Sequence, residues 1–123
     1  MKLTLDNAPG ANLVRGYSAQ GIRIGEQLLT HSCIVTAERV VADFPPQSFA
    51  EFTVEHLGLV LGLAPELVLL GTGPVQQFAG AAMRAACAAR GIGLESMELG
   101  AACRTYNVLV QEERRVAAAL FLR

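Results

Sequence analysis

Two short stretches of this sequence combine residue types and spacings that could perform chemistry. The first is Gly71-Thr72-Gly73, which follows an apolar run at residues 67–70 and precedes Pro74. Glycine adopts backbone angles that other residues avoid, and proline suits the first position of a helix because it has no N–H group to leave unpaired. A strand, a tight turn and a helix with free backbone amides are therefore expected here. In α/β proteins such a turn often holds an anion.

The second stretch lies nearer the carboxyl end of the sequence. If residues 101–112 form a helix, Arg104, Asn107 and Gln111 share one face because they are spaced i, i+3 and i+7. Arginine can clamp a carboxylate or a phosphate, and asparagine offers both a donor and an acceptor. The alternative is a structural role, either as a solvated helix face or as side chains that bind the carbonyl groups of neighbouring loops. The structural role is the favoured interpretation.

Convergence of the two stretches would create a binding or catalytic site for a small anionic or nucleotide-like ligand. The near-neutral charge of the chain does not oppose such a site, since one arginine and one helix terminus suffice locally. The hypothesis requires that Gly73 and Arg104 lie on the same side of the sheet. The candidate ligand-binding residues are Gly71, Thr72, Gly73, Arg104 and Asn107.

The first stretch also resembles part of a dinucleotide-binding motif. That motif reads Gly-x-Gly-x-x-Gly and has an acidic residue about 20 positions further on, which binds the ribose. Glu95 matches the acid, but Gln76 occupies the position of the third glycine. A structural turn is therefore the favoured interpretation. A phosphate-binding loop of the NTPase type is excluded, because the Gly-Lys-Ser/Thr ending is missing.

No acid–base pair, nucleophile–base pair or metal-ligand cluster stands out in the sequence. Cys103 falls in the first turn of the predicted helix beside Arg104, where its pKa could be lowered. However, His31 and His56 are distant in sequence, and a small buried thiol is the favoured interpretation for Cys103. We predict no catalytic residue, no metal and no cofactor, which leans against an enzyme without deciding the matter.

The composition indicates a small globular protein of a reducing compartment. The chain has 123 residues, a net charge of −1, 52% hydrophobic and 17% charged residues, which fits one domain over residues 1–123. Such a charge gives no electrostatic reason to bind nucleic acid. Polar and charged residues at 111–115 interrupt the longest apolar stretch, so we expect no membrane-spanning segment. Three cysteines without Cys-x-x-Cys spacing, and a start without a signal or transit pattern, predict a cytoplasmic protein.

Apolar periodicity predicts a β-rich first third and then alternating helices and strands. The first strands are expected over residues 13–17, 22–24 and 28–36, with a short extension at 40–41. A run without polar alternation predicts a strand that is covered on both faces and therefore central. The later strands are expected over residues 67–70, 92–95 and 116–122, the last of them being this central strand.

The first predicted helix follows Thr53, a residue type that caps helices with its side-chain oxygen. Val54, Leu57 and Leu61 would share its buried face, and the helix should end by residues 62–65.

Two more helices are expected. The longest spans residues 74–90, where many alanines favour helix formation and close packing, and Gly91 is suited to end it. The last spans residues 101–112. Its inward-facing residues are expected to be Ala102, Tyr106, Leu109 and Val110. This order of elements predicts an α/β (α+β) fold, with a mixed β-sheet, packed helices and an N-terminal β meander.

Two motifs resemble those of a known family. They are Leu70-Gly71-Thr72-Gly73, and Met97 together with Ala-Ala-Cys-Arg-Thr-Tyr-Asn-Val-Leu at residues 101–109. Together they resemble the Mth-domain family of small, mostly uncharacterised proteins, which includes mitochondrial complex I assembly factor three. The likeness covers nearly the whole chain. It implies a single three-layer α/β domain around a mixed sheet, and it implies no settled catalytic residues.

The sequence departs from this family at Leu99. Members often carry threonine two residues after the methionine, so a hydroxyl cap or ligand contact would be missing, and Ser96 could cap the helix instead. The absence of a transit peptide fits a bacterial member of the family.

Two functions follow as hypotheses. The first is a non-enzymatic accessory or assembly factor that binds a protein partner, with assembly of a respiratory complex as the candidate process. It predicts an exposed apolar patch of several hundred Å² or a homodimer surface. The alternative is the site for a small anionic or nucleotide-like ligand described above.

Overall fold

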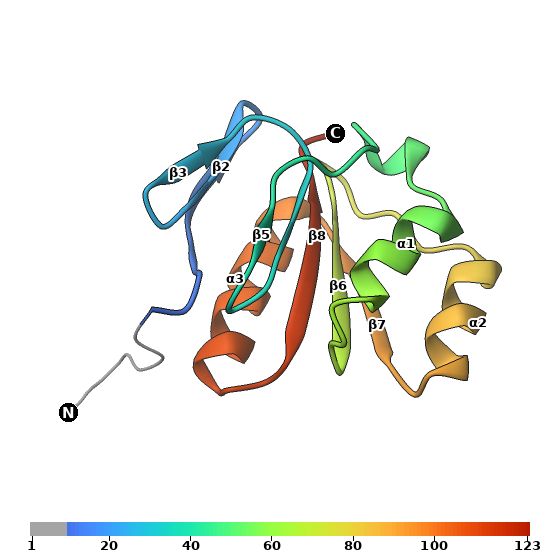
Figure 1. Cartoon of the computed structure of the whole chain (residues 1–123). Helices are drawn as coiled ribbons and strands as arrows, with labels where there is room; N and C mark the ends of the chain where they lie inside the picture. Colours follow the sequence, from blue (N-terminus) through green and yellow to red (C-terminus); the bar gives the residue numbers. More distant parts are fainter. Residues whose placement is uncertain (1–9) are drawn as a thin grey trace.

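A computed structural model describes residues 10–123 of the chain (Figure 1), and residues 1–9 of the predicted domain lie outside this range. The first part contains β1 (Val14–Ser18), β2 (Gly21–Ile24), β3 (Gln27–Leu29), β4 (Cys33–Val35), β5 (Val40–Val41) and a 3₁₀ turn (Phe49–Glu51). The second part contains α1 (Val54–Leu61), β6 (Leu67–Thr72), α2 (Ala81–Ala89), β7 (Gly93–Met97), α3 (Leu99–Gln111) and β8 (Val116–Phe121).

The main sheet is five-stranded and mixed. Its strand order is β5-β4-β8-β6-β7, in which β6 runs parallel to both β7 and β8, and β4 runs antiparallel to β5 and β8. Every residue of β8 is buried, as predicted for a central strand that is covered on both faces. The side chains of the alanines at residues 117–119 are small, so helices can approach this strand closely.

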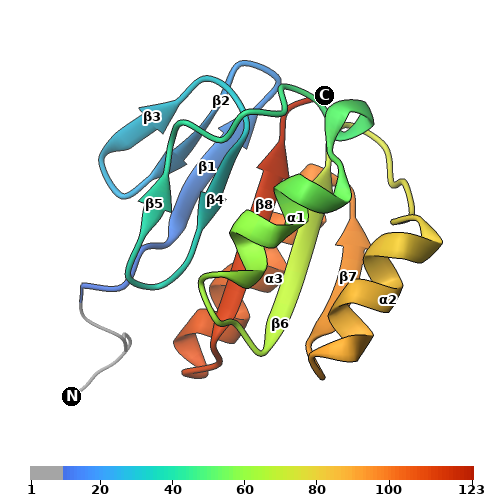
Figure 2. The same cartoon turned by 45° about the vertical axis from the view of Figure 1, so that its right-hand side comes forward.

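The molecule has three layers, with this sheet in the middle and helices on both of its faces. A second, smaller sheet lies outside these layers. Val68 and Leu70 of β6 pack with α1 and α2 on one face, whereas Leu69 packs with Tyr106 of α3 on the other. Figure 2 shows α1 and α2 in front of the sheet and α3 behind it. The meander β1-β2-β3 forms a separate small sheet against α3, into which Ile22 is fully buried. The predicted fold class is confirmed.

The predicted strand over residues 28–36 is wrong in one respect, because the chain changes sheets within it. β3 belongs to the meander and β4 belongs to the main sheet, and the two are separated at residues 30–32. Ser32 is buried at this corner, and its hydroxyl donates to the carbonyl oxygen of Pro46. A hydroxyl bound to a distant backbone carbonyl leaves no sign in local periodicity.

The predicted cap of α1 is confirmed. The Thr53 hydroxyl accepts from the His56 N–H at 3.4 Å, and the His56 Nδ1 accepts from the Thr53 N–H at 3.0 Å. This reciprocal arrangement satisfies two backbone donors at the helix start and gives His56 a structural role. Leu57 and Leu61 are buried as predicted, but Val54 is exposed.

The predicted helix over residues 74–90 is wrong at its amino end. α2 begins only at Ala81, after the non-helical residues 73–80, and α3 is therefore the longest helix. The predicted stop at Gly91 is correct, since Gly91 adopts a φ of +67° and the following N–H donates to the Cys87 carbonyl. Within residues 10–123, none of the helices has both the length and the apolar character needed to cross a bilayer.

α3 begins two residues earlier than predicted. Its cap is the Glu98 carboxylate, whose Oε1 accepts from the Ala101 N–H at 2.9 Å, so the expectation that Ser96 caps this helix is wrong. Ala102, Tyr106 and Val110 face the core as predicted.

The close contact of α3 with β6 gives the first testable prediction. A Cβ on Gly71 would lie 3.0 Å from Leu120 Cδ2 and 3.1 Å from Ala102 Cβ. We expect Gly71→Ala to lower the free energy of unfolding by about 1–3 kcal/mol through overpacking, measured by urea denaturation. Gly16→Ala is the matched control, because a Cβ there meets nothing within 4 Å. Equal stability of the two variants would contradict the packing described here.

Candidate functional site

The Gly71-Thr72-Gly73 stretch lies at the carboxyl end of β6, where α3 also begins. Gly71 and Thr72 belong to the strand, and only Gly73 makes the turn, with a φ of +90°. Gly71 therefore serves close packing, whereas Gly73 serves the backbone conformation. The sequence marks both glycines as special but predicts that both of them form the turn.

The segment after Gly73 is an ordered loop instead of a helix. The buried Thr72 hydroxyl lies 2.7 Å from the Val75 carbonyl oxygen and 3.1 Å from that of Met97, and it accepts from the Gln77 N–H at 3.0 Å. One threonine thus holds the first half of the loop against the end of β7. The predicted row of free helix amides after Pro74 is wrong, because these contacts stabilise a different backbone path.

The helix terminus that does lie beside Gly73 is that of α3. The Leu99 N–H donates to the Gly73 carbonyl oxygen at 2.8 Å, so the turn and the helix start are joined directly. The Glu98 carboxylate already occupies the positive end of this helix. An anionic ligand at this terminus would be repelled by the negative charge of Glu98.

Arg104 reaches the same end of the sheet through Tyr17 of β1. Its Nη1 donates to the Tyr17 hydroxyl oxygen at 2.7 Å. Tyr17 itself lies across Gly100, where a Cβ would come within 2.7 Å of the tyrosine oxygen. Only a glycine at this position of α3 lets the ring lie against the helix.

The two predicted stretches therefore meet around Tyr17, and a surface hollow of about 270 Å³ lies between them. We call it the Tyr17 hollow. Its lining includes Tyr17, Gly73, Pro74, Glu98, Leu99 and Leu122. Sequence reasoning missed Tyr17, because nothing in the local pattern of β1 marks a residue that contacts a helix 87 positions further on.

Asn107 lies further along α3 and binds the backbone of β1 with both ends of its amide. Its Oδ1 accepts from the Val14 N–H at 2.9 Å, and its Nδ2 donates to the Val14 carbonyl oxygen at 2.8 Å. The pairing of β1 with β2 is irregular between Val14 and Gly16, so the side chain replaces regular strand contacts there. This bidentate contact is the structural role that we favoured for the polar face of the helix.

The cysteines of the core are poor nucleophiles. Burial raises the pKa of Cys33 to about 12, with the nearby Cys103 as the second cause. Burial also raises the pKa of Cys103 to about 12, and Glu98 adds to this effect, whereas Arg104 opposes it only weakly. Both groups stay protonated near neutral pH. Across residues 10–123, no three or more His, Cys, Asp or Glu residues gather where they could hold a metal ion.

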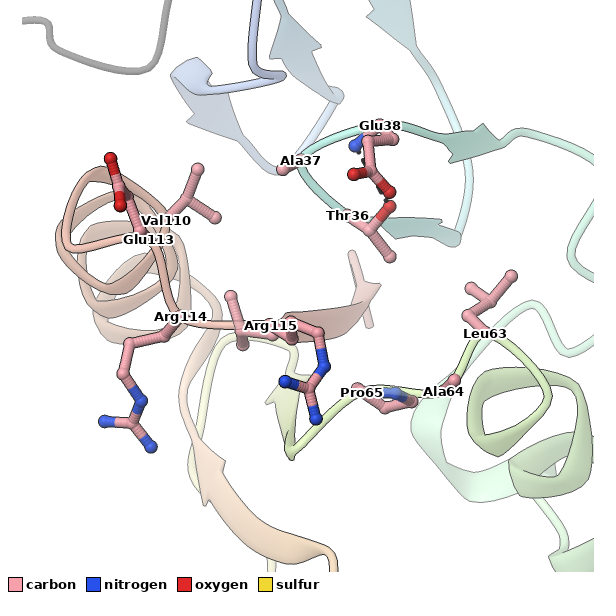
Figure 3. A pocket seen from close by; sticks show the side chains of 11 residues that line it. Thr36, Ala37, Glu38, Leu63, Ala64, Pro65, Val110, Glu113, Arg114 and Arg115 are labelled. Carbon is pink, nitrogen blue, oxygen red and sulfur yellow. Dashed lines mark hydrogen bonds between the residues drawn. The ribbon is translucent and has the colours of Figure 1, made fainter.

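A second hollow of about 270 Å³ lies at the opposite end of the sheet (Figure 3). Arg115 lies between the end of α3 and Pro65 in this view. Glu66 accepts from the Arg115 N–H at 3.1 Å and from the Arg114 Nε at 2.9 Å, and these bonds, in that order, lower its pKa. Glu66 thus holds Arg114 and Arg115, which lie beside this hollow in the connection between α3 and β8.

Residues 14–121 match the family described as proteins of unknown function, DUF498/DUF598. The chain belongs to this family. Its structure is similar to the crystal structure of a Bordetella parapertussis protein, with a TM-score of 0.86, 37% sequence identity, and coverage of 93% of this chain and 98% of that one.

Two further similarities agree with the predicted resemblance, which is confirmed. A Bordetella pertussis structure described as a Mth938-like domain has a TM-score of 0.84 and 32% identity, covering 98% of this chain and 92% of that one. The Danio rerio protein named NADH dehydrogenase [ubiquinone] 1 alpha subcomplex assembly factor 3 is 30% identical over 115 residues. That match covers 92% of this DUF498/DUF598 chain but only 66% of the Danio rerio protein, just under two thirds.

The buried thiols give a prediction about pH. Because the folded-state pKa values of Cys33 and Cys103 are about 12, the folded chain keeps protons that the unfolded chain loses above about pH 8.5. The stabilisation is complete below that pH and is lost as the pH rises toward 12. We expect the free energy of unfolding to fall steadily from pH 8.5 to 10.5 in urea titrations.

The matched variant carries Cys33→Ala and Cys103→Ala together. It should be less stable at neutral pH, because it loses core volume, and its stability should change less over the same pH range. A steeper loss in this variant than in the wild type would contradict the assignment. In the native protein at pH 8, both thiols should also react much more slowly with a disulfide reagent than in the urea-unfolded chain.

Proposed function

We propose that this protein is a non-enzymatic accessory factor that binds a protein partner at the Tyr17 hollow. A role in the assembly of a respiratory complex is supported by the name of the Danio rerio relative, with which most of this chain aligns. The match covers 66% of the Danio rerio protein, and we therefore propose this role for the present chain instead of transferring it. A cytoplasmic location is supported by the three free cysteines of the chain, and a bacterial source by its similarity to the two Bordetella proteins.

The observation that carries the proposal is the pairing of Arg104 with Tyr17 at the rim of an apolar hollow. Tyrosine and arginine are the side chains that most often dominate the binding energy of protein interfaces. Tyr17 is 42% exposed, yet its hydroxyl is fixed by Arg104 and its ring by Gly100. A side chain that is already ordered loses little conformational entropy when a partner binds.

The floor of the hollow supports the same conclusion. Leu99 is buried beneath it, and Pro74 and Leu122 line its sides. Apolar residues together with Tyr17, which Arg104 binds, and Glu98 resemble the buried centre and polar rim of a protein interface. All of these side chains can take part in partner binding without any chemical reaction.

The test is native affinity capture of the full chain from its host cells. We expect the wild type to recover one protein partner in near-stoichiometric amounts. Tyr17→Ala and Arg104→Ala should each weaken this capture at least tenfold, whereas Val108→Ser, another exposed position on α3, should not. Recovery of no stoichiometric partner, or equal capture by all variants, would contradict the proposal.

A second candidate is a small anionic or nucleotide-like ligand bound by Gly71, Thr72, Gly73, Arg104 and Asn107. Its support is that Gly73 lines the Tyr17 hollow and that Arg104 hydrogen-bonds to Tyr17, which lines it too. Against it, the Thr72 hydroxyl and the Asn107 amide already bind the protein's own backbone. Arg104 would therefore supply most of the attraction.

A thermal-shift titration with phosphate, small carboxylates and nucleotides tests this candidate. A ligand at 100 times its dissociation constant should stabilise the folded chain by about 2.7 kcal/mol. The shift should disappear in Arg104→Ala and persist in Val108→Ser. A wild-type melting temperature that none of these compounds changes would argue against the ligand site and leave partner binding as the function.

A further inference from the structure

A separate surface feature lies on the other side of the sheet from the Tyr17 hollow. A third concavity, of about 250 Å³, is formed where the loop after β6 and the start of α2 meet the edge strand β7. We call it the Phe78 hollow. Its lining includes Gln76, Phe78, Ala79, Arg84, Leu94 and Glu95. Figures 1 and 2 both show α2 beside β7 at this outer edge.

Phe78 is the most exposed large hydrophobic side chain of residues 10–123. It is 78% exposed, and Val75 in the same loop is 62% exposed. Transfer of a phenyl ring out of water lowers the free energy, and exposed aromatic rings commonly anchor protein contacts. Phe78 therefore is a projecting apolar group at a recess whose lining includes the apolar residues Ala79 and Leu94.

Two opposite charges line the same hollow without pairing with each other. Within residues 10–123, the ion pairs all involve Glu66, so Arg84 and Glu95 form none. Both side chains are exposed, and the Arg84 Nη1 donates to the Ala79 carbonyl oxygen at 2.6 Å. The surface thus carries an apolar projection, an apolar recess, a cation and an anion, each of which has its complement on the same surface.

Such a surface is complementary to itself. In a two-fold contact, residue i of one chain meets residue j of the other, and residue j of the first meets residue i of the second. We propose that the Phe78 hollow is the contact surface of a symmetric homodimer. Phe78 of each chain enters the partner's recess, and Arg84 of each chain faces the partner's Glu95.

The exposed part of α2 next to the hollow fits this arrangement. Its solvent-facing side chains near the hollow are small, namely Ala81, Ala82 and Ala85, so a second chain can approach the helix closely. Pairing of two β7 edges is disfavoured, because the Gln76 Nε2 already donates to the Ser96 carbonyl oxygen at 3.0 Å on that edge. The dimer therefore forms through side chains, and the Tyr17 hollow on the α3 side stays open.

Analytical ultracentrifugation of the purified full chain tests the proposal first. The wild type should sediment as a dimer at high micromolar concentration and dissociate on dilution. Phe78→Ser should raise the dissociation constant at least tenfold, and Val108→Ser should leave it unchanged. Because Phe78 and Val108 are both exposed, neither substitution should alter the far-ultraviolet circular dichroism spectrum or the melting curve of the monomer.

A charge exchange tests the pairing of the two chains directly. Arg84→Glu alone places two glutamates opposite each other, and Glu95→Arg alone places two arginines opposite each other, so each variant should be monomeric. An equimolar mixture should form a heterodimer, because both cross-chain pairs then join a glutamate with an arginine. A contact within one chain would not be restored by mixing, so this result distinguishes the two arrangements.

Any one of several results would overturn the proposal. They are a wild type that is monomeric at every concentration, a Phe78→Ser variant that dimerises as well as the wild type, and a mixture of the charge variants that stays monomeric. A different protein that binds a monomeric chain at Phe78 would also overturn it. None of these results bears on capture of a partner at the Tyr17 hollow, which the Tyr17→Ala and Arg104→Ala variants test separately.

Discussion

The close approach of α3 to the main sheet is the contact on which the rest of the structure depends. Gly71 has no side chain, so Ala102 of α3 and Leu120 of β8 meet directly above β6. α3 is then covered on its other side by the meander, and Ile22 and Cys33 complete the same core. One helix thus lies between two sheets and fixes their relative position.

Polar contacts along α3 hold the meander in place. The buried Tyr106 donates its hydroxyl to the Asn12 carbonyl oxygen at 2.7 Å, Asn107 binds both backbone groups of Val14, and Arg104 binds the Tyr17 hydroxyl. Removal of a partner from a buried hydrogen bond typically costs about 1–3 kcal/mol. The side chains Arg104 and Asn107, which looked like ligand-binding groups, therefore also determine where β1 lies, and only Arg104 contacts a residue of the Tyr17 hollow, namely Tyr17.

The sequence predicted the parts of this fold that local patterns control. The apolar run of β8, the cap at Thr53 and the stop at Gly91 each depend on neighbouring residues, and the structure agrees with all three. The start of α2 could not be predicted, because Pro74 and a long alanine run favour a helix, whereas the Thr72 hydroxyl stabilises a loop through Val75 and Gln77. For the candidate site, spacing identified Gly73 and Arg104, but Tyr17 is brought to them only by tertiary folding.

The central claim is that α3 presents Gly100 to Tyr17 and so brings β1 and the Gly73 turn together. Nuclear Overhauser measurements on the wild-type chain in solution test this most directly. We expect strong cross-peaks between the Tyr17 ring protons and the Gly100 α-protons, because Tyr17 Cε1 and the tyrosine oxygen lie within 2.9 Å of where a Cβ of residue 100 would be. A Tyr17 ring that rotates freely in solvent, without contact to Gly100, would contradict the account.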